Sequence, residues 1–185
     1  MSESLITKKA LSQALIDLCS TKRFDKLSIA DITNHCGLKR QTFYYHFMDK
    51  YDLLSWTYQQ DILQYLGHDI NLDNWDEQVL GMLKLIQDHK RFYHNTVTAD
   101  PGILSNCFSD VTKKLFQDLF KRLDERKKVS EKDREFYSRF FSYGCCGVLL
   151  NWIVEGYKES AEEIGKQMVR LAKDTEFLAS QLYSN

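Results

Sequence analysis

Apolar residues recur along most of this chain at intervals of three and four, the spacing of one buried face on an α-helix. Leu11, Ala14, Leu15 and Leu18 open the pattern. The repeats predict helices over 4–20, 28–36, 39–47, 50–66, 75–96, 103–107, 111–127 and 130–157, and from 160 onward. One proline and eight glycines are too few for a fold with many tight turns. The sequence therefore predicts an all-α fold.

Local signals mark several ends of these helices. Asp49 is expected to cap the helix 50–66, whose predicted buried stripe is Leu53, Trp56, Leu63 and Leu66. The helix 75–96 is expected to be continuous, and Asp-Pro-Gly at 100–102 is expected to break the chain before two separate helices.

The segment 28–50 reads as two short helices joined by a tight turn. Ser28 suits an N-cap, and Gly37 suits the left-handed backbone of a helix end. In the second helix Phe43 and Phe47 share one face, and the opposite face carries Arg40, Gln41, Tyr44 and Tyr45. This is the plan of a helix-turn-helix, whose second helix lies in the DNA major groove. An ordinary helical hairpin with a solvated face would show the same spacing.

The side chains of the second helix suit DNA. Arginine pairs with guanine and glutamine with adenine through two hydrogen bonds each, so Arg40 and Gln41 are candidates for reading bases. Thr42, Tyr44 and Lys50 are donors of the kind that hold phosphate oxygens.

The stretch GLKRQTFYYHFMDKYDLL closely resembles the end of the DNA-binding domain of TetR-family regulators. The resemblance implies a three-helix helix-turn-helix domain over 1–49 and a helical effector and dimerisation domain over 50–185. It makes Arg40 and Gln41 base-reading candidates, and the wider DNA-binding set becomes Ser28, Lys39, Arg40, Gln41, Thr42, Tyr44, Tyr45 and Lys50. Lys39 stands where the family often has a capping serine, so the helix lacks a cap worth about 1 kcal/mol. Lys39 is then either a DNA contact or a solvated side chain.

The net charge of −1 gives no general attraction to nucleic acid. Residues 1–52 carry eight Lys/Arg and six Asp/Glu, a balance of +2, whereas the rest carries 17 and 20, a balance of −3. This difference in charge between the two parts is small, and it predicts that only a local surface of the protein attracts DNA. No secretory signal is expected, and the longest uncharged run, Phe140 to Val154, is too short to span a membrane. A cytoplasmic protein is therefore expected.

The sequence contains little that indicates catalysis or metal binding. His89 and His94 are five apart and not on one helix face, and no phosphate loop or G-x-S-x-G motif occurs. We expect neither an enzyme nor a cofactor or metal site. The five scattered cysteines indicate buried, reduced thiols, with the adjacent Cys145 and Cys146 as the alternative of a redox sensor.

The last two helices have the pattern of an association surface. Ser130-x-x-Asp133 and Ser160-x-x-Glu163 start them. The second carries a seam spaced by four and three, which packs either on a partner or on the chain's own core. Because the last two helices of TetR-family proteins usually form the dimer interface, the resemblance implies a homodimer built on Tyr143, Gly147, Ile164, Met168, Leu171 and Leu178.

An effector site is expected among the middle helices on the same resemblance. The candidate lining residues are Trp56, Tyr58, Phe92, Tyr93, Phe116, Phe120 and Trp152, with an ordinary aromatic core as the alternative. RQTFYYHFMDKYDLLSW together with LLNWIVEGYKESAEEI resembles a branch that includes activators of dihydroxyacetone kinase operons. In that branch a kinase-like partner protein can act as co-activator. The alternatives are a repressor that responds to a small molecule, and a helical adaptor that no longer reads its DNA operator.

Overall fold

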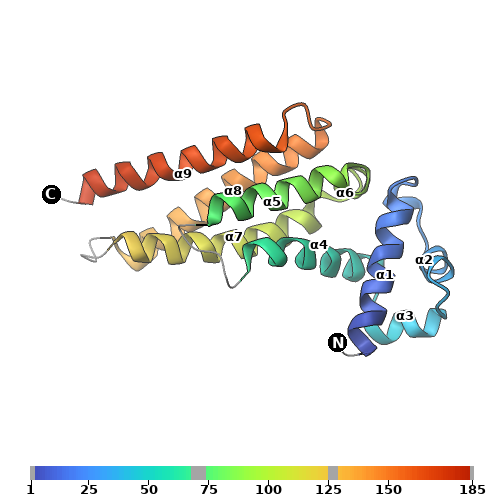
Figure 1. The fold of residues 1–185 in the computed structure, drawn as a ribbon. Helices are drawn as coiled ribbons and strands as arrows, with labels where there is room; N and C mark the ends of the chain where they lie inside the picture. The colour runs from blue at the N-terminus through green and yellow to red at the C-terminus, as the bar shows by residue number, and fades with distance from the viewer. Residues whose placement is uncertain (1–2, 68–73, 125–128, 184–185) are drawn as a thin grey trace.

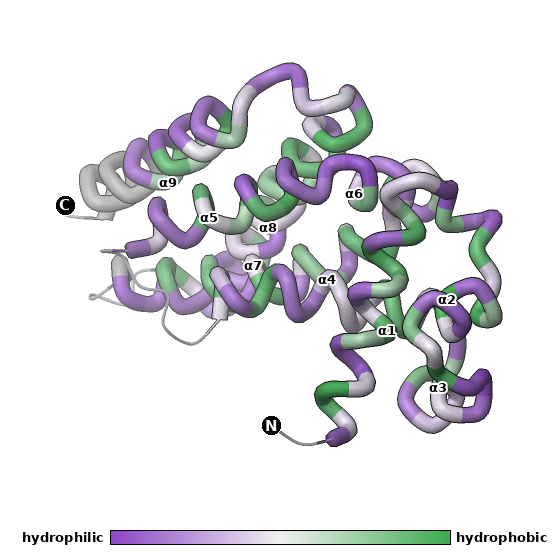
Figure 2. The backbone as a smooth tube through the Cα atoms, turned by 45° about the vertical axis from the view of Figure 1, so that its right-hand side comes forward, coloured by the Kyte–Doolittle hydropathy of each residue, from purple (hydrophilic) through white to green (hydrophobic). Residues whose placement is uncertain are grey.

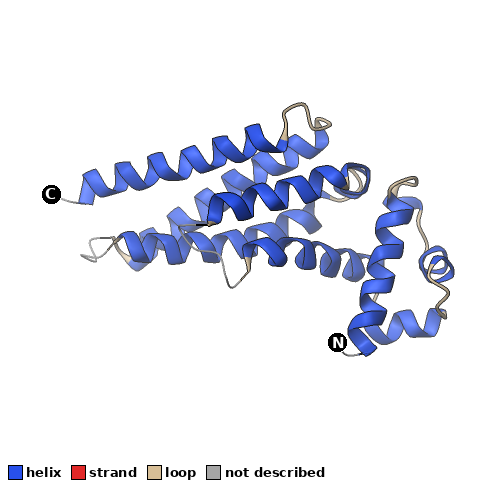
Figure 3. Cartoon of the chain, viewed as in Figure 1, coloured by secondary structure: helices blue, strands red, loops and turns tan. Residues whose placement is uncertain are grey.

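The computed structural model describes residues 3–67, 74–124 and 129–183, and the backbone of these residues forms helices and connecting turns (Figure 3). The elements are α1 (Glu3–Cys19), the 3-10 helix η1 (Phe24–Lys26), α2 (Ile29–His35), α3 (Arg40–His46), α4 (Lys50–Leu66), α5 (Trp75–Asp88), α6 (Lys90–Val97), α7 (Pro101–Leu123), α8 (Glu131–Val154) and α9 (Ala161–Tyr183). The all-α prediction is confirmed. In the described part of the chain, none of the helices combines the length and apolar character needed to cross a bilayer.

The molecule is elongated, with α1, α2 and α3 at one end and α5, α7, α8 and α9 at the other (Figure 1). Helix α4 connects the two ends and packs on α1 as well as on α5 and α7. Helix α6 lies at the junction, where it contacts α1, η1, α7 and α8. Movement in the helical core can therefore reach the N-terminal unit through the packing contacts of α4 and of α6.

A single hydrophobic cluster extends through both ends of the molecule. Leu11, Ile32 and Phe43 are fully buried in the N-terminal unit, and Tyr58 and Leu149 are fully buried in the larger one. Figure 2 shows hydrophobic positions recurring along each helix between polar ones, as the sequence pattern predicts. Continuous burial across the junction favours transmission of motion over independent movement of the two ends.

Several predicted helix ends are confirmed in atomic detail. Gly37 has a φ of +69°, the left-handed conformation that the turn between α2 and α3 requires. Asp49 Oδ1 accepts hydrogen bonds from the amides of Tyr51 and Asp52. Ser160 and Glu163 form a capping box, in which each side chain accepts from the other residue's amide. The residues of each signal lie within three positions of one another, so the sequence determines these helix ends locally.

Ser28 caps α2 in the same way and offers a test of this local control. Its Oγ accepts from the Asp31 amide at 3.1 Å, and its own amide donates to Asp31 Oδ2 at 2.8 Å. We expect Ser28→Ala to lower the free energy of unfolding by about 1 kcal/mol, because an amide at the helix start loses its partner. Urea denaturation measures this. Asn34→Ala, exposed later in α2, is expected to change it by less than about 0.5 kcal/mol, and an equal loss in both variants would argue against the cap.

Two predicted boundaries are wrong. The segment 75–96 is not one helix, because the backbone leaves helical geometry at His89 (φ −99°, ψ 30°) and α6 turns to pack on α1 and α8. Residues 101–123 form one helix, not two. Asp100 Oδ1 accepts from the Gly102 amide and Pro101 occupies the first turn, so Asp-Pro-Gly begins a helix here instead of separating two.

The predicted buried stripe of α4 is also partly wrong. Leu53 and Leu66 are buried and Trp56 is half-buried, but Leu63 is 46% exposed. Tyr58 and Ile62 are buried in its place. The reason is that α4 packs on α1 at one end and on α5 and α7 at the other, so its buried face is wider than one stripe.

Helices α7 and α8 meet through small polar side chains. Thr112 Oγ1 lies 2.8 Å from Ser142 Oγ, which donates to the Ser109 carbonyl at 3.0 Å. One turn further on, Cys146 Sγ lies 3.4 Å from Ser105 Oγ. Small side chains let the two helices approach closely. The larger aromatic residues of α8 lie on other faces of that helix.

Candidate DNA-binding site

Helix α3 presents the predicted polar face to solvent. Phe43 is fully buried and packs against Phe47, with ring centroids 5.9 Å apart. This packing fixes the helix on the domain, so that Arg40, Gln41 and Tyr44 point away from it and are exposed. Tyr45 is 83% exposed. A seven-residue helix held on one side and open on the other has the form needed to enter a major groove.

The ends of α3 agree with the sequence. Lys39 is its N-cap residue, and its side chain makes no capping hydrogen bond. Lys39 is exposed, and whether it contacts DNA stays a prediction. At the other end Met48 follows Phe47, the C-cap residue of α3, and is 81% exposed. The sequence pattern does not single out Met48, because one apolar residue in a link carries no periodic signal.

Arg40 is partly ordered by its own helix. Its guanidinium donates to Tyr44 Oη at 3.3 Å and lies 5.7 Å from the centre of the Tyr44 ring. The two residues are four apart and therefore neighbours on one helix face. Tyr44 restricts the Arg40 side chain before any ligand is present, which reduces the entropy that binding would cost.

The structure gives less support to Thr42 and Ser28. Thr42 is half-buried in the first turn of α3. The Ser28 hydroxyl donates to Asp31 Oδ2 at 2.8 Å. The Ser28 amide and hydroxyl, with Lys22, hold the pKa of Asp31 below its usual value. The start of α2 thus already holds a carboxylate, and this does not favour the predicted phosphate contact of Ser28.

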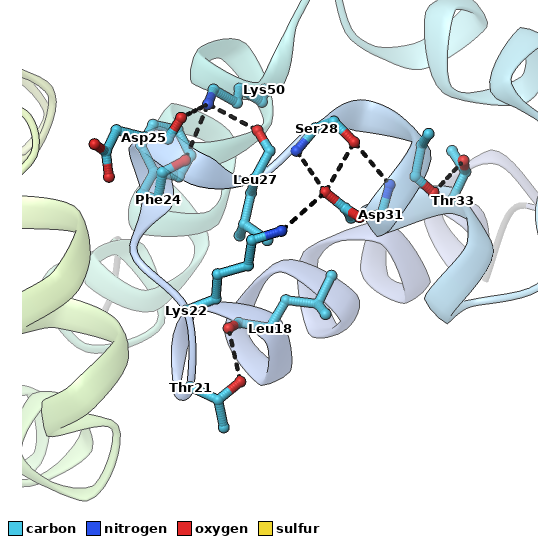
Figure 4. A network of polar contacts seen from close by, with 11 residues as sticks. Leu18, Thr21, Lys22, Phe24, Asp25, Leu27, Ser28, Asp31, Thr33 and Lys50 are labelled. Atoms are coloured by element: carbon cyan, nitrogen blue, oxygen red, sulfur yellow. Dashed lines mark hydrogen bonds and ion pairs between the residues drawn. The ribbon is translucent and has the colours of Figure 1, made fainter.

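Lys50 requires a correction. Its Nζ donates to the carbonyl oxygens of Phe24 at 2.9 Å, Leu27 at 2.8 Å and Asp25 at 3.3 Å (Figure 4). An ammonium group has three N–H donors, so all of them are used inside the protein. The predicted phosphate contact does not agree with this geometry. Burial lowers the pKa of Lys50, and the nearby Asp25 partly opposes that effect.

Comparison with known proteins decides the family. Residues 13–55 match the family model described as bacterial regulatory proteins, tetR family, and residues 73–174 match a TetR-type model described as transcriptional regulator C-terminal region. The second match alone covers more than half of the chain. The chain belongs to the TetR family. It is therefore a DNA-binding transcriptional regulator and not an enzyme.

Similar TetR-family proteins cover almost the whole chain. The HTH-type dhaKLM operon transcriptional activator DhaS of Lactococcus lactis is 25% identical over 175 residues, which are 92% of this chain and 91% of DhaS. A solved structure of the dihydroxyacetone kinase operon activator DhaS has a TM-score of 0.74 at 22% identity and covers 94% of this chain and 98% of that one. A tetR-family regulator from Streptomyces coelicolor has a TM-score of 0.65 at 16% identity, covering 98% and 85%. These likenesses confirm the fold.

The aromatic residues predicted to line an effector pocket of this TetR-family regulator do not all come together. Tyr58, Phe92 and Tyr93 form a fully buried cluster, in which Tyr58 Oη donates to Thr96 Oγ1 and Tyr93 Oη donates to Asp61 Oδ2. Trp56 packs on Phe47 near α1. Phe116 and Phe120 pack against Phe141 farther along the core. Trp152 packs on Tyr157, whose hydroxyl donates to the Lys90 carbonyl at the start of α6.

The alternative of an ordinary aromatic core therefore accounts for these side chains better. An open groove of about 350 Å³ does lie at the junction of the two ends, between α1 and the α5–α6 turn. Its lining residues are Ile16, Ser20, Asp88, His89, Lys90, Arg91 and Phe92. Phe92 is the one predicted residue among them.

The residues predicted for the dimer interface divide into two groups. Tyr143 is 61% exposed and Gly147 is exposed, as an interface requires. Ile164 is only 4% exposed and Met168 is packed on the chain's own core, because this part of α9 lies on α5. For these two the prediction is wrong. Leu171 is half exposed, and the Leu178 side chain lies outside the described part.

Burial disfavours the reactive form of two of the cysteines. All five are free. Burial raises the pKa of Cys145 to about 11 and that of Cys19 to about 12. Because the thiolate is the reactive form, Cys145 is a protonated and unreactive thiol at neutral pH, which disfavours a redox sensor built on it.

Proposed function

We propose that this protein binds a near-palindromic operator as a dimer in the cytoplasm, with Arg40 and Gln41 of each α3 reading base edges. The observation that carries the proposal is the exposed face of α3 opposite the buried Phe43. Two such helices about 34 Å apart would enter successive major grooves on one side of the duplex. Tyr44 and Thr42 remain candidate phosphate contacts, and Tyr45 and Lys39 lie beside them.

The distribution of small and aromatic residues around α8 supports the dimer. Its inward face carries the small residues Ser138, Ser142 and Cys146, whereas Phe136, Phe140 and Tyr143 are 53%, 65% and 61% exposed. Large aromatic side chains on the outer face of a helix indicate a partner. A Cβ built on Gly144 or Gly147 would meet nothing within 4 Å, so a second helix could approach there.

We propose to divide the chain at residues 49 and 50, with a DNA-binding domain over 1–49 and an effector and dimerisation domain over 50–185. Helix α4 begins at Lys50 and contacts α1, α5 and α7. It therefore belongs to the larger domain yet touches the smaller one. Regulation would act by rotating α4 and changing the separation of the two α3 helices, and an effector can shift that equilibrium only by its differential affinity for the two spacings.

We further propose that the protein activates a dihydroxyacetone kinase operon with a protein co-activator. The similarity to DhaS, whose name describes an activator of the dhaKLM operon, supports the operon. The burial of Tyr58, Phe92 and Tyr93 in the core supports a protein over a small molecule as the effector. Direct repression through a small molecule is the second candidate, and the groove beside α6 would be its site.

A mobility shift on duplex DNA from upstream of the protein's own gene tests operator binding. Binding that weakens between 50 and 200 mM salt (roughly the range over which phosphate contacts lose affinity) and that survives excess random-sequence duplex is expected. Equal competition by random duplex would contradict operator reading.

Calorimetry with dihydroxyacetone tests the co-activator. The purified regulator alone is expected to bind dihydroxyacetone weakly or not at all, because Tyr58, Phe92 and Tyr93 are fully buried in the core. Addition of the dihydroxyacetone kinase subunit from the same operon is expected to change operator affinity. Tight one-to-one binding of the metabolite by the regulator alone, with a matching change in operator affinity, would replace the partner with direct sensing.

A further inference from the structure

The ammonium group of the half-buried Lys50 lies in a corner between η1 and the start of α2 (Figure 4). Beyond its three carbonyl acceptors, it lies 4.8 Å from the centre of the Phe24 ring and 5.6 Å from that of Tyr51. These rings meet edge to face with centroids 5.2 Å apart, and Phe24 is fully buried. Oxygen acceptors and the negative faces of two rings together form a site suited to one cation.

The Lys50 contact joins two segments of the chain that lie on either side of the helix-turn-helix. Leu27, one of the acceptors, directly precedes the cap of α2. Lys50 opens α4, and only residues 47–49 separate it from the end of α3. The segment 28–49 holds the whole helix-turn-helix, and the Lys50 ammonium joins the chain just before it to the chain just after it.

We propose that Lys50 is a positioning residue that clamps the two ends of the helix-turn-helix and couples α4 directly to the start of α2, and that it does not neutralise a DNA phosphate. This inference rests on the proposed reading of DNA by α3. Rotation of α4 then carries α2 and α3 together as one body, without bending the link between α3 and α4.

An ammonium group meets this geometry better than the alternatives. Its three donors point from a single atom toward the three carbonyls, whereas a guanidinium group holds its donors in a planar fork. Methionine has a similar unbranched stem and can still pack on Phe24 and Tyr51, but it donates no hydrogen bond. Lys50→Met therefore removes the clamp, and Lys50→Arg keeps the charge but misplaces the donors.

The first measurement needs no DNA. Hydrogen exchange followed by mass spectrometry on the full-length chain is expected to speed up about tenfold over 24–31 in Lys50→Met, because charged hydrogen bonds of this kind are lost. Exchange in α7 and α8 is expected to stay unchanged. Lys9→Met, which removes one exposed lysine from α1, is the matched control and is expected to leave 24–31 unchanged. Unchanged exchange over 24–31 in Lys50→Met would overturn the clamp.

The second measurement separates the clamp from a phosphate contact. The probe is duplex DNA from upstream of the protein's own gene, titrated at several salt concentrations. A clamp predicts that Lys50→Met and Lys50→Arg both bind about tenfold more weakly at every salt concentration, with the wild-type salt slope. A phosphate contact predicts a slope lower by about one unit in Lys50→Met and recovery in Lys50→Arg, and that result would overturn the proposal.

Two further outcomes are decisive. If the wild-type chain binds no DNA while exchange over 24–31 still responds to Lys50→Met, the proposed operator binding fails and the clamp stands. If Lys50→Met does not fold, nuclear magnetic resonance of the wild type decides. A slowly exchanging lysine ammonium signal with contacts to the Phe24 ring protons supports the clamp, and ammonium signals that all exchange rapidly with water overturn it.

Discussion

Replacing Phe140 and Tyr143 together with glutamate is expected to turn the proposed dimer into a monomer and to weaken operator binding by a factor on the order of 10² to 10⁴. Both side chains are more than half exposed on the outer face of α8. In a dimer they would be buried, and two carboxylates would then have to lose their water without a partner. A monomer binds one half-site, so the second half-site no longer contributes through its high effective concentration.

Sedimentation velocity at micromolar concentration and fluorescence anisotropy with an operator duplex measure the two parts of this prediction. Lys114→Glu on the exposed surface of α7 changes the net charge by the same amount and is expected to leave both the mass and the affinity unchanged. A wild-type monomer at micromolar concentration would contradict the dimer itself. A double variant that remains dimeric would move the interface away from this face of α8.

Arg40→Ala and Gln41→Ala are each expected to cost about 1–3 kcal/mol at one or two base pairs and to relax the preference there. The geometry supports this expectation, because both side chains are exposed on a helix whose opposite face is fixed by Phe43. Tyr44→Phe is expected to have a smaller effect. It removes the hydroxyl that accepts from Arg40 but keeps the ring beneath the guanidinium group.

Binding to a library of duplexes with single base-pair changes measures the preference. Gln60→Ala removes an exposed amide from α4 and is expected to change neither affinity nor preference. A loss that is equal for all sequences in Arg40→Ala would assign Arg40 to the phosphates instead of the bases. Loss of affinity without any lost preference in both variants would mean that α3 does not read the sequence.

The sequence itself determined the features that depend on near neighbours. The caps of Ser28, Asp49 and Ser160 and the left-handed Gly37 all follow from residues within three positions of one another. The exposed face of α3 follows in the same way, since Phe43 and Phe47 lie four apart and leave the polar residues opposite. The family motif lies in this same local stretch, which explains why the resemblance and the residue chemistry agree.

The tertiary structure decided those features for which the local sequence allows several arrangements. In these cases packing against distant segments selects one of them. The chain bends at His89 because α6 packs on α1 and α8, and the sequence around 89 carries no breaker. Ile164 has the spacing of an association seam, but α5 of the same chain covers it. The aromatic residues of α4 and α6 and those of α7 became two separate core clusters, because these helices meet different partners.

Lys50 shows the difference most clearly. From the sequence it is a lysine at the start of a helix beside a DNA-reading motif, and an exposed phosphate contact is the natural expectation. Its acceptors lie 23 to 26 residues away along the chain, and no local pattern links them to it. Helix periodicity determines which face a residue occupies. Where a long, flexible side chain ends depends on which backbone groups the packed helices bring within its reach.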